Sequence, residues 1–368
     1  MNKFKLVSRY QILDVLRGVA IILVLFNHHL ALGFLQKGGW IGVSLFFILS
    51  GYLISGLLFK EIINTGKLDL KLFYIRRGFK IYPNFYFFIF FTVLTLYILF
   101  LTTDHLAERL SLKSLLIECF FIQNYFHGFW YHTWSIAVEE HFYLLFPLFL
   151  LIFKIKNLTK VKWFYTISSF LILLVLIFRL YHYHTNHSFE IFVNVFSTHF
   201  RIDGLIFGIM IGYDEYYNKS KIKAFVLKYI YIFIPLILIT IIPAFILNLE
   251  NPFVFTYGFT LISLGFSILL FYCLEFKEIK FSSFLVRIIS YIGTLSYAIY
   301  LWQGFILSFV MRFIEESLKI KSTSFPDFFI FASLSILAGW FFTQFLENYF
   351  LSIRQKHYPP KKIEIEAE

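Results

Sequence analysis

The sequence contains few charged residues and almost no cysteine. Charged side chains make up 15% of its 368 residues and hydrophobic ones 59%, whereas soluble domains have about 25% charged and 45–50% apolar residues. This balance excludes a soluble globular domain and indicates several membrane spans, because about 20 apolar residues cross a bilayer. The two cysteines, Cys119 and Cys273, have no Cys or His at ligand spacing, which excludes a disulfide framework and a structural zinc site. We expect no bound metal.

Long apolar runs, by contrast, are abundant. They are continuously apolar and around 20 residues long, which favours transmembrane helices over the alternating strands of a membrane barrel. The first run lacks the cleavage site of a signal peptide, so we expect it to remain as the first span of a full-length chain. The sequence therefore predicts an all-α polytopic bundle of about ten transmembrane helices, and the bias toward phenylalanine, 52 residues, indicates lipid-facing filler. The ten runs cover residues 13–35, 40–59, 81–101, 134–153, 163–180, 198–213, 229–247, 253–274, 288–310 and 328–350.

Basic residues outnumber acidic ones, 33 to 22. In a membrane protein such an excess indicates cytoplasmic loops before any nucleic-acid partner. If both termini face the cytoplasm, the inner segments hold 24 of the 33 basic residues, a bias strong enough to set the orientation. We therefore expect an integral protein of the cell membrane with both termini cytoplasmic. Residues 1–353 would form the membrane domain and 354–368 a cytoplasmic tail, since no other segment is long enough to build its own core.

The first apolar run carries ionisable residues that suggest function. Charged groups inside a membrane span cost about 2.5–3.5 kcal/mol each on insertion scales. Arg17 and His28 are eleven residues apart, close to three helical turns, so they share one helix face and lie about 16 Å apart along its axis. That face would connect the cytoplasmic end of the span with a deeper site. Alternatively, Arg17 extends to the inner headgroups while His28 and His29 lie at the outer interface.

A second candidate motif opens the fourth span. Ser135, Glu139 and Tyr143 are spaced four residues apart and would line one side of a helix, with the carboxylate near the outer side. Glu139 could hold a histidine, because a carboxylate on one ring nitrogen sets the tautomer and raises the basicity of the other. The alternative is a glutamate that is stabilised at a helix N-terminus and solvated by the outer loop. We favour this alternative for Glu140.

A basic cluster, consisting of Arg76, Arg77 and Lys80, lies between the second and third spans. Arg77 and Lys80 are one helical turn apart and cytoplasmic in the expected topology. Guanidinium and ammonium groups on one face could bind the pyrophosphate or ribose phosphate of a nucleotide-like donor such as coenzyme A. Juxtamembrane basic clusters also set topology and bind anionic lipid. The cluster by itself does not separate these roles.

Together these stretches resemble the acyltransferase 3 family of membrane-bound acyltransferases. The family pattern includes an arginine and a histidine separated by ten residues in the first span, matched here by Arg17 and His28. Further motifs follow in the family's order, and the resemblance extends over about residues 10–350. They are the second-span run 42–52, Trp134-Ser135 with Glu139 and Tyr143, Arg201 with Asp203, and the late-span pair Ser296-Tyr297. The resemblance implies substrate-binding roles for Ser135, Tyr143, Arg201, Asp203, Ser296 and Tyr297.

The sequence departs from the family pattern at three positions. Ser44 stands where the family often has an acidic residue, Lys80 where a second arginine is usual, and Gln303 where a histidine often follows the Ser-Tyr motif. Lysine keeps the charge but lacks the planar fork that binds phosphate in a bidentate way. The extracytoplasmic hydrolase-like domain often fused in the family is not among these 368 residues. We therefore expect acceptor handling to rest on the membrane domain or on a separate partner.

The resemblance implies an O-acyltransferase that moves an acyl group, acetyl in the first instance, from cytoplasmic acyl-CoA to a hydroxyl of a cell-surface polysaccharide or glycolipid. It implies no permanently bound cofactor and no nucleic-acid partner, with membrane lipid as surroundings. The residues suggest a mechanism in which His28 is the general base and Glu139 orients it. The donor phosphates would be held by Arg17, Arg76, Arg77 and Lys80. Direct transfer is the simpler path, because no nucleophilic cysteine or strained serine is evident, while an acyl-histidine or a relay stays open.

Two other classes of function also stay open. A secondary transporter or a flippase of a glycan precursor would also use intramembrane Arg, His and Glu. Such proteins often show inverted repeats and broken spans, which we do not find in the sequence. A sensor or scaffold without chemistry would tolerate the loss of His28 or Glu139.

Overall fold

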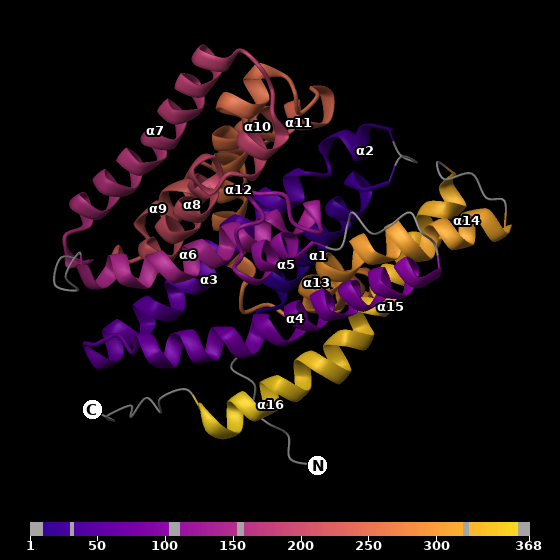
Figure 1. Cartoon of the computed structure of the whole chain (residues 1–368). Coiled ribbons are helices and arrows are strands. Elements are labelled where there is room, and N and C mark those ends of the chain that lie inside the picture. The colour runs from indigo at the N-terminus through magenta and orange to yellow at the C-terminus, as the bar shows by residue number, and fades with distance from the viewer. Residues whose placement is uncertain (1–9, 30–32, 103–110, 153–157, 319–323, 360–368) are drawn as a thin grey trace.

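The structure, a computed structural model, describes residues 10–29, 33–102, 111–152, 158–318 and 324–359. Within these ranges the chain is helical and contains no β-strand, and Figure 1 shows the helices packed in a bundle. The all-α prediction is therefore confirmed. The α-helices are α1 (Gln11–Asn27), α2 (Gly33–Gly38), α3 (Ile41–Thr65), α4 (Leu70–Thr102), α5 (Leu112–Cys119), α6 (Trp134–Ile152), α7 (Val161–Asn186), α8 (Thr198–Tyr217), α9 (Lys221–Lys228), α10 (Ile230–Ile241), α11 (Pro243–Ile246), α12 (Phe259–Cys273), α13 (Phe284–Phe305), α14 (Arg312–Leu318), α15 (Phe325–Phe342) and α16 (Asn348–His357).

Short 3-10 and π-helical segments connect or extend several of these helices. They are η3 (Tyr131–Thr133), η5 (Phe192–Phe196), η6 (Val254–Gly258), η7 (Leu274–Phe276), η8 (Ile306–Met311) and η9 (Thr343–Glu347). π-Helical turns are uncommon and are often found at functional sites. Here η8 directly follows α13, and η9 joins α15 to α16. Because α16 continues to His357, helical structure crosses the predicted boundary at residue 353.

The predicted membrane spans correspond to helices. In the described ranges eight helices are long and apolar enough to cross a membrane, or nine if the bent pair Lys221–Lys228 and Ile230–Ile246 is one span. That pair bends by 93°. The first predicted span corresponds to α1, which has 17 residues and is slightly shorter than the about 20 of a typical span. Each of the ten apolar runs therefore contains a helix, and the prediction of a polytopic bundle is confirmed.

Two helices differ from the predicted spans. α1 ends at Asn27, with His28 as its C-cap, rather than at residue 35. Three successive polar residues, Asn27 to His29, end the helix, although hydropathy continues beyond them. α4 begins at Leu70 and runs unbroken to Thr102, so the basic cluster lies in the first third of a long helix and not in a loop.

The helices α1 and α13 are in direct backbone contact. A Cβ added to Gly293 of α13 would lie 1.8 Å from the carbonyl oxygen of Asp14, and one added to Gly18 of α1 would lie 2.1 Å from that of Ile289. Small residues allow membrane helices to approach this closely. At the start of both helices, the Phe281 backbone N–H donates to Gln11 at 2.8 Å. The two helices therefore begin at the same end of the bundle.

The helices α3 and α8 form a second close pair. Near the start of both, Arg201 donates to Ser44 at 2.9 Å, and farther along both Tyr52, in the middle of α3, donates to Glu215 at 2.7 Å. These contacts show that α3 and α8 run parallel. Ten spans that cross in alternation would give the second and sixth the same direction, as observed.

Phenylalanine fills the core as well as the outer surface. Phe47, Phe59, Phe85, Phe88 and Phe331 are at most 1% exposed. Aromatic rings meet edge to face around Phe59, which contacts rings of α6, α7 and α8. The prediction that the phenylalanine bias reflects lipid-facing filler therefore needs correction, because edge-to-face ring contacts let large side chains fill the spaces between helices.

Candidate active site

An open cleft lies between α1, α3, α4, α6 and α13. The empty space between its walls, open solvent included, is about 900 Å³. Its lining combines basic, acidic and hydroxyl side chains with an apolar floor. The predicted site residues that line it are Arg17, Arg77, Lys80, Ser135, Glu139, Ser296 and Tyr297. Folding thus brings together residues from five separate helices.

The basic side chains of the cleft come from α1 and α4. The Arg77 guanidinium lies over the Tyr143 ring, 3.9 Å from its centroid, which is a cation–π contact. Lys80 forms an ion pair with Glu347, and Arg17 lies 3.8 Å from Asp14. About one third of the Arg17 and Lys80 side chains is exposed, 36% and 33%. Both cations therefore have access to an anionic ligand in the cleft.

Arg76 does not line the cleft with Arg77. Its guanidinium donates to the carbonyl oxygen of Tyr358, and Arg354 donates to the Arg76 carbonyl oxygen at 3.4 Å. Successive residues of a helix point about 100° apart, so Arg76 and Arg77 cannot face the same way. Arg76 holds the end of α16 against α4, while Arg77 faces the cleft.

Helix α6 places Ser135 and Glu139 in the cleft wall and Tyr143 beside it, as their spacing predicts. The Tyr143 hydroxyl donates to the Glu139 carboxylate and lies 2.7 Å from the Ser50 hydroxyl of α3. Ser50 also lines the cleft. Ser50 was not among the predicted site residues, although it belongs to the 42–52 motif.

The two glutamates of α6 differ from their predicted surroundings. No contact joins Glu139 to His28 in the part of the chain that the structure describes, and Glu139 instead lies near Arg77. Glu140 accepts from Tyr82 at 3.2 Å and lines the cleft. The first turns of α6 pack against the basic part of α4, so neither carboxylate is solvated by an outer loop. The proposed orienting role of Glu139 toward His28 is therefore not supported.

The histidine at the end of α1 has its tautomer set by the backbone. His28 Nδ1 lies 3.0 Å from the carbonyl oxygen of Val24, one turn earlier. Because a carbonyl oxygen only accepts, Nδ1 carries the proton and Nε2 of the neutral ring keeps its lone pair. The Val24 carbonyl oxygen therefore sets the tautomer of His28, the role that was predicted for Glu139. His28 is half-buried and does not itself line the cleft.

A second histidine, which sequence reasoning missed, lies near His28. His132 is buried, interacts electrostatically with His28, and its Nε2 lies 3.0 Å from the Leu301 carbonyl oxygen. Tyr300, which lines the cleft, donates to the His132 carbonyl oxygen and accepts from Ser135 at 2.7 Å. A chain of neighbouring groups therefore runs from the cleft wall through Tyr300 and His132 to His28. The only signal in the sequence was the position of His132 just before the Trp-Ser motif.

The predicted Ser-Tyr pair lies on α13, on the same side of the cleft as Tyr300. Ser296 and Tyr297 both line the cleft. The Tyr297 hydroxyl donates to the Ile81 carbonyl oxygen of α4 at 2.9 Å. This bond joins α13 to α4 next to Arg77 and Lys80, so Tyr297 helps to hold the basic wall in place.

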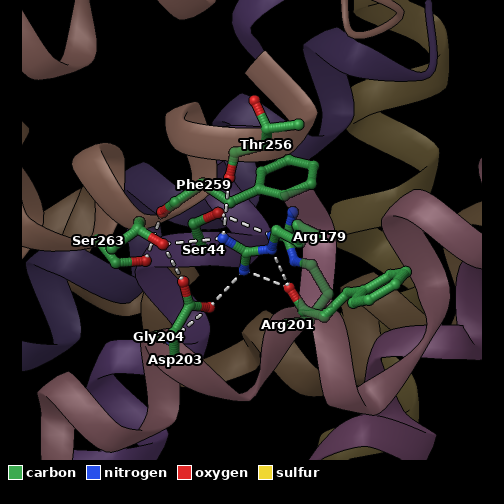
Figure 2. Close-up of polar contacts among 10 residues, drawn as sticks. Ser44, Arg179, Arg201, Asp203, Gly204, Thr256, Phe259 and Ser263 are labelled. Carbon is green, nitrogen blue, oxygen red and sulfur yellow. Dashed lines mark hydrogen bonds and ion pairs between the residues drawn. The ribbon is translucent and has the colours of Figure 1, made fainter. Parts of the chain in front are cut away.

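Arg201 and Asp203 lie away from the cleft, in a buried cluster with Arg179 (Figure 2). Arg179 forms an ion pair with Asp203 at 2.8 Å, and Thr260 donates to the same carboxylate at 2.7 Å. Arg179 also donates to Thr260 at 2.8 Å. Sequence reasoning did not single out Arg179, because its partners come from α8 and α12, far along the chain.

Arg201 has no carboxylate partner of its own in this cluster. Its Nη2 donates to Ser44, and its guanidinium lies 3.8 Å from the centroid of the Phe259 ring. Its Nη1 is buried without a hydrogen-bond partner among the described residues. The cluster therefore packs α3, α7, α8 and α12 together and does not contribute to the cleft. No group of three or more His, Cys, Asp or Glu in the described ranges could hold a metal ion.

Comparison with known proteins finds clear relatives. Residues 10–344 match the acyltransferase 3 family, described as an acyltransferase domain. A Staphylococcus aureus protein of strain COL, named "Putative O-acetyltransferase SACOL0978", is 30% identical over 382 residues, which cover 95% of this chain and 59% of that protein. O-acetyltransferase OatA of S. aureus strain NCTC 8325 is 30% identical over 323 residues, which cover 81% of this chain and 50% of that protein.

The chain thus spans between half and three fifths of the length of these relatives. No solved structure matches it. The family match includes α1 with Arg17 and His28, all helices that form the cleft, and the late Ser-Tyr pair. With its helical bundle of apolar spans, the chain belongs to the acyltransferase 3 family of integral membrane proteins.

Proposed function

We propose that this protein transfers an acyl group, acetyl in the simplest case, from acyl-CoA to a hydroxyl of a cell-surface polysaccharide or glycolipid. The names of its relatives support O-acetyl transfer. The observation that carries the proposal is the cleft, in which Arg17, Arg77 and Lys80 surround a space open to a small molecule. Tyr300 in its wall donates to the His132 carbonyl oxygen, and His132 lies near His28, whose Nε2 can accept a proton.

The donor binds with its phosphates at the basic wall of the cleft. Arg77 is well suited to phosphate because its planar guanidinium makes bidentate hydrogen bonds. Coenzyme A is a large anion that does not cross lipid, so its phosphates stay at the cytoplasmic side. Arg17 and His28 lie about 16 Å apart along α1, and an extended pantetheine arm is of the same order. The thioester would therefore reach the level of His28.

His28 acts as the general base. Its Nδ1 donates to Val24 at 3.0 Å, so Nε2 takes the proton from the acceptor hydroxyl as its oxygen attacks the thioester carbonyl. The same ring then returns the proton to the leaving thiolate. No acyl-enzyme is needed, and direct transfer accounts for the reaction.

The orientation follows the basic segments. The segments expected inside meet at one end of the bundle, where Lys223 pairs with Glu275 at 2.9 Å and Arg76 donates to Tyr358. This grouping supports an orientation with both termini in the cytoplasm of the cell membrane. The acceptor would then approach His28 from the outer side.

Steady-state kinetics of the purified protein in detergent test the function. We expect free CoA to be released from acetyl-CoA only when a glycan acceptor is present. Arg77→Ala should chiefly raise KM for acetyl-CoA, because it removes a donor contact, and His28→Ala should chiefly lower kcat. Binding of a non-hydrolysable CoA analogue should be lost in Arg77→Ala and kept in His28→Ala.

Other outcomes would assign the protein differently. Uptake of a glycan precursor into vesicles without CoA release would identify a transporter or flippase. If His28→Ala releases CoA at the wild-type rate, His28 is not the general base. Loss of analogue binding in His28→Ala, with retention in Arg77→Ala, would reverse the roles of the two residues.

A further inference from the structure

Gln303, near the end of α13, has a buried amide without a partner. The residue is 1% exposed, and neither amide atom has a hydrogen-bond partner among the described residues. The other buried amides with an unpaired atom, those of Asn84, Gln123 and Asn124, each lack a partner for one atom only. Buried polar groups are almost always hydrogen-bonded, so an amide with both atoms unpaired points to a ligand.

This amide lies beside the proposed general base. Helices α1 and α13 begin together at Gln11 and Phe281, touch again at Gly18 and Gly293, and bring His28 next to Gln303. The Gln303 side chain lies within reach of a weak hydrogen bond to His28, although neither of its amide atoms makes one of ordinary geometry. His28 Nδ1 is engaged by Val24. Because the Gln303 amide has two N–H groups, one can approach His28 Nε2 while the other N–H and the amide oxygen stay unpaired.

His132 occupies the space on the neighbouring side. A Cβ at Gly304 would lie 2.3 Å from a ring carbon of His132, so the glycine next to Gln303 makes room for that imidazole. The Leu301 carbonyl oxygen, 3.0 Å away, holds His132 Nε2. The ring is fixed by this bond and by burial, so it cannot turn to pair with Gln303. One amide N–H of Gln303 is thus left to a ligand.

Polar groups along α13 connect the cleft with Gln303. Ser296 and Tyr300 line the cleft, and Gln303 follows Tyr300 by three residues, so the three share one helix face. Seven residues of helix rise about 10 Å. A thioester on an arm that extends from phosphates in the cleft would follow this face and meet His28 and Gln303 together.

We propose that Gln303 is a catalytic residue whose amide N–H donates a hydrogen bond to the carbonyl oxygen of the acyl thioester; this inference rests on the proposed function. As the acceptor oxygen bonds to the carbonyl carbon, its proton passes to His28 Nε2. The carbonyl π electrons move onto the oxygen, and the Gln303 N–H stabilises the oxyanion. The carbonyl then re-forms, the C–S bond breaks, and the thiolate takes the proton from His28. The products are an ester and free CoA.

Gln303→Met tests this role, because methionine has a similar length but no donor. We expect kcat to fall by about 100- to 1,000-fold, the usual effect of losing one oxyanion donor, with KM for acetyl-CoA within about threefold of wild type. The thermal midpoint should stay equal or rise, since the substitution removes an unpaired buried amide. Gln303→His keeps an N–H donor and should retain at least a tenth of the wild-type kcat.

Ser335→Ala provides a matched control. Ser335 on α15 is fully buried with an unpaired hydroxyl and does not line the cleft. We expect an equal or higher thermal midpoint for Ser335→Ala, as for Gln303→Met, but wild-type kcat. This pair separates the removal of an unpaired polar group from the loss of a catalytic donor.

Three outcomes would overturn the inference. If Gln303→Met keeps kcat within threefold while His28→Ala is inactive, the proposed function stands and the oxyanion role is wrong. If Gln303→Met lowers the thermal midpoint together with kcat, Gln303 is a structural residue. If the wild-type protein releases no CoA with any glycan acceptor, the proposed function fails and this inference fails with it.

Discussion

At the scale of single residues, the two buried arginines in Figure 2 contribute differently to the stability of the protein. Arg179 and Arg201 are 1% and 3% exposed. Arg179 neutralises Asp203 at 2.8 Å, whereas Arg201 stacks on Phe259 and repels Arg179. A charge that balances a buried partner is required for stability, but an unbalanced one is not.

We therefore expect Arg179→Leu to destabilise the protein by about 3–5 kcal/mol, because it leaves the Asp203 carboxylate buried and unpaired. Arg201→Leu should cost at most about 1 kcal/mol, because the lost bond to Ser44 is offset by relief of the repulsion. Chemical unfolding in detergent measures both. An equal loss in the two variants would contradict this distinction.

Glu118 is a buried carboxyl in α5, outside the membrane spans. Burial raises its pKa to about 7, although the Trp130 N–H and the Thr133 hydroxyl donate to it. Between pH 4.5, the ordinary pKa, and about pH 7, Glu118 in the folded protein therefore keeps a proton that the unfolded chain has released. Stability attributable to this group falls as pH rises through that window and is lowest above it.

Glu118→Gln should remove this pH dependence, because the amide stays neutral and can still accept from Trp130. We expect the thermal midpoint of wild type to fall more than that of Glu118→Gln between pH 5 and pH 8. Other titrating groups act equally in both proteins, so the difference between them isolates Glu118. The same fall in both proteins would show that Glu118 does not titrate in this range.

At the scale of helices, the contact between α1 and α13 sets the geometry of the site. Arg17 lies on α1 and His28 is its C-cap, and Ser296, Tyr300 and Gln303 lie on α13. Their relative positions depend on the close approach at Gly293, where a Cβ would lie 1.8 Å from a backbone oxygen. A side chain there must push the two helices apart.

Gly293→Ala should therefore destabilise the protein by roughly 1–3 kcal/mol, the usual cost of overpacking, and lower acyl transfer. Thermal unfolding and CoA release measure the two effects. Gly56→Ala is the control, because a Cβ at Gly56 meets only the ring of Tyr216, at 3.3 Å. If both variants behave alike, the close approach of α1 and α13 is not needed.

At the scale of the whole molecule, the orientation in the membrane can be tested at two exposed positions. Lys71 lies at the start of α4, and Glu250 lies in the loop between α11 and η6. In a background without Cys119 and Cys273, we expect an impermeant maleimide to label Glu250→Cys on intact cells. Lys71→Cys should react only after the cells are opened, because the basic segments face the cytoplasm.

Labelling of Lys71→Cys on intact cells would show that the orientation is the reverse of the proposed one. The basic wall of the cleft would then face outward, and cytoplasmic acyl-CoA could not reach it. The same experiment therefore also tests the access route of the donor.

The sequence by itself determined the helical membrane architecture, the family, and seven of the sixteen residues that line the cleft. An apolar run of about 20 residues is a local property, so its helix and its place in the bilayer need no tertiary information. Spacing along one helix is local as well. Ser135 and Glu139 share a wall, and Arg77 and Lys80 line one side, as their spacing predicts.

Only the tertiary structure decided the partners. Arg76 turned toward α16, Glu139 paired with Tyr143 and not with His28, and Gln303 came to lie beside His28. These outcomes depend on which helices touch and at what level. That depends in turn on close approaches such as the one at Gly293, between residues far apart in the chain. Hydropathy and helical periodicity carry no information on such distant contacts.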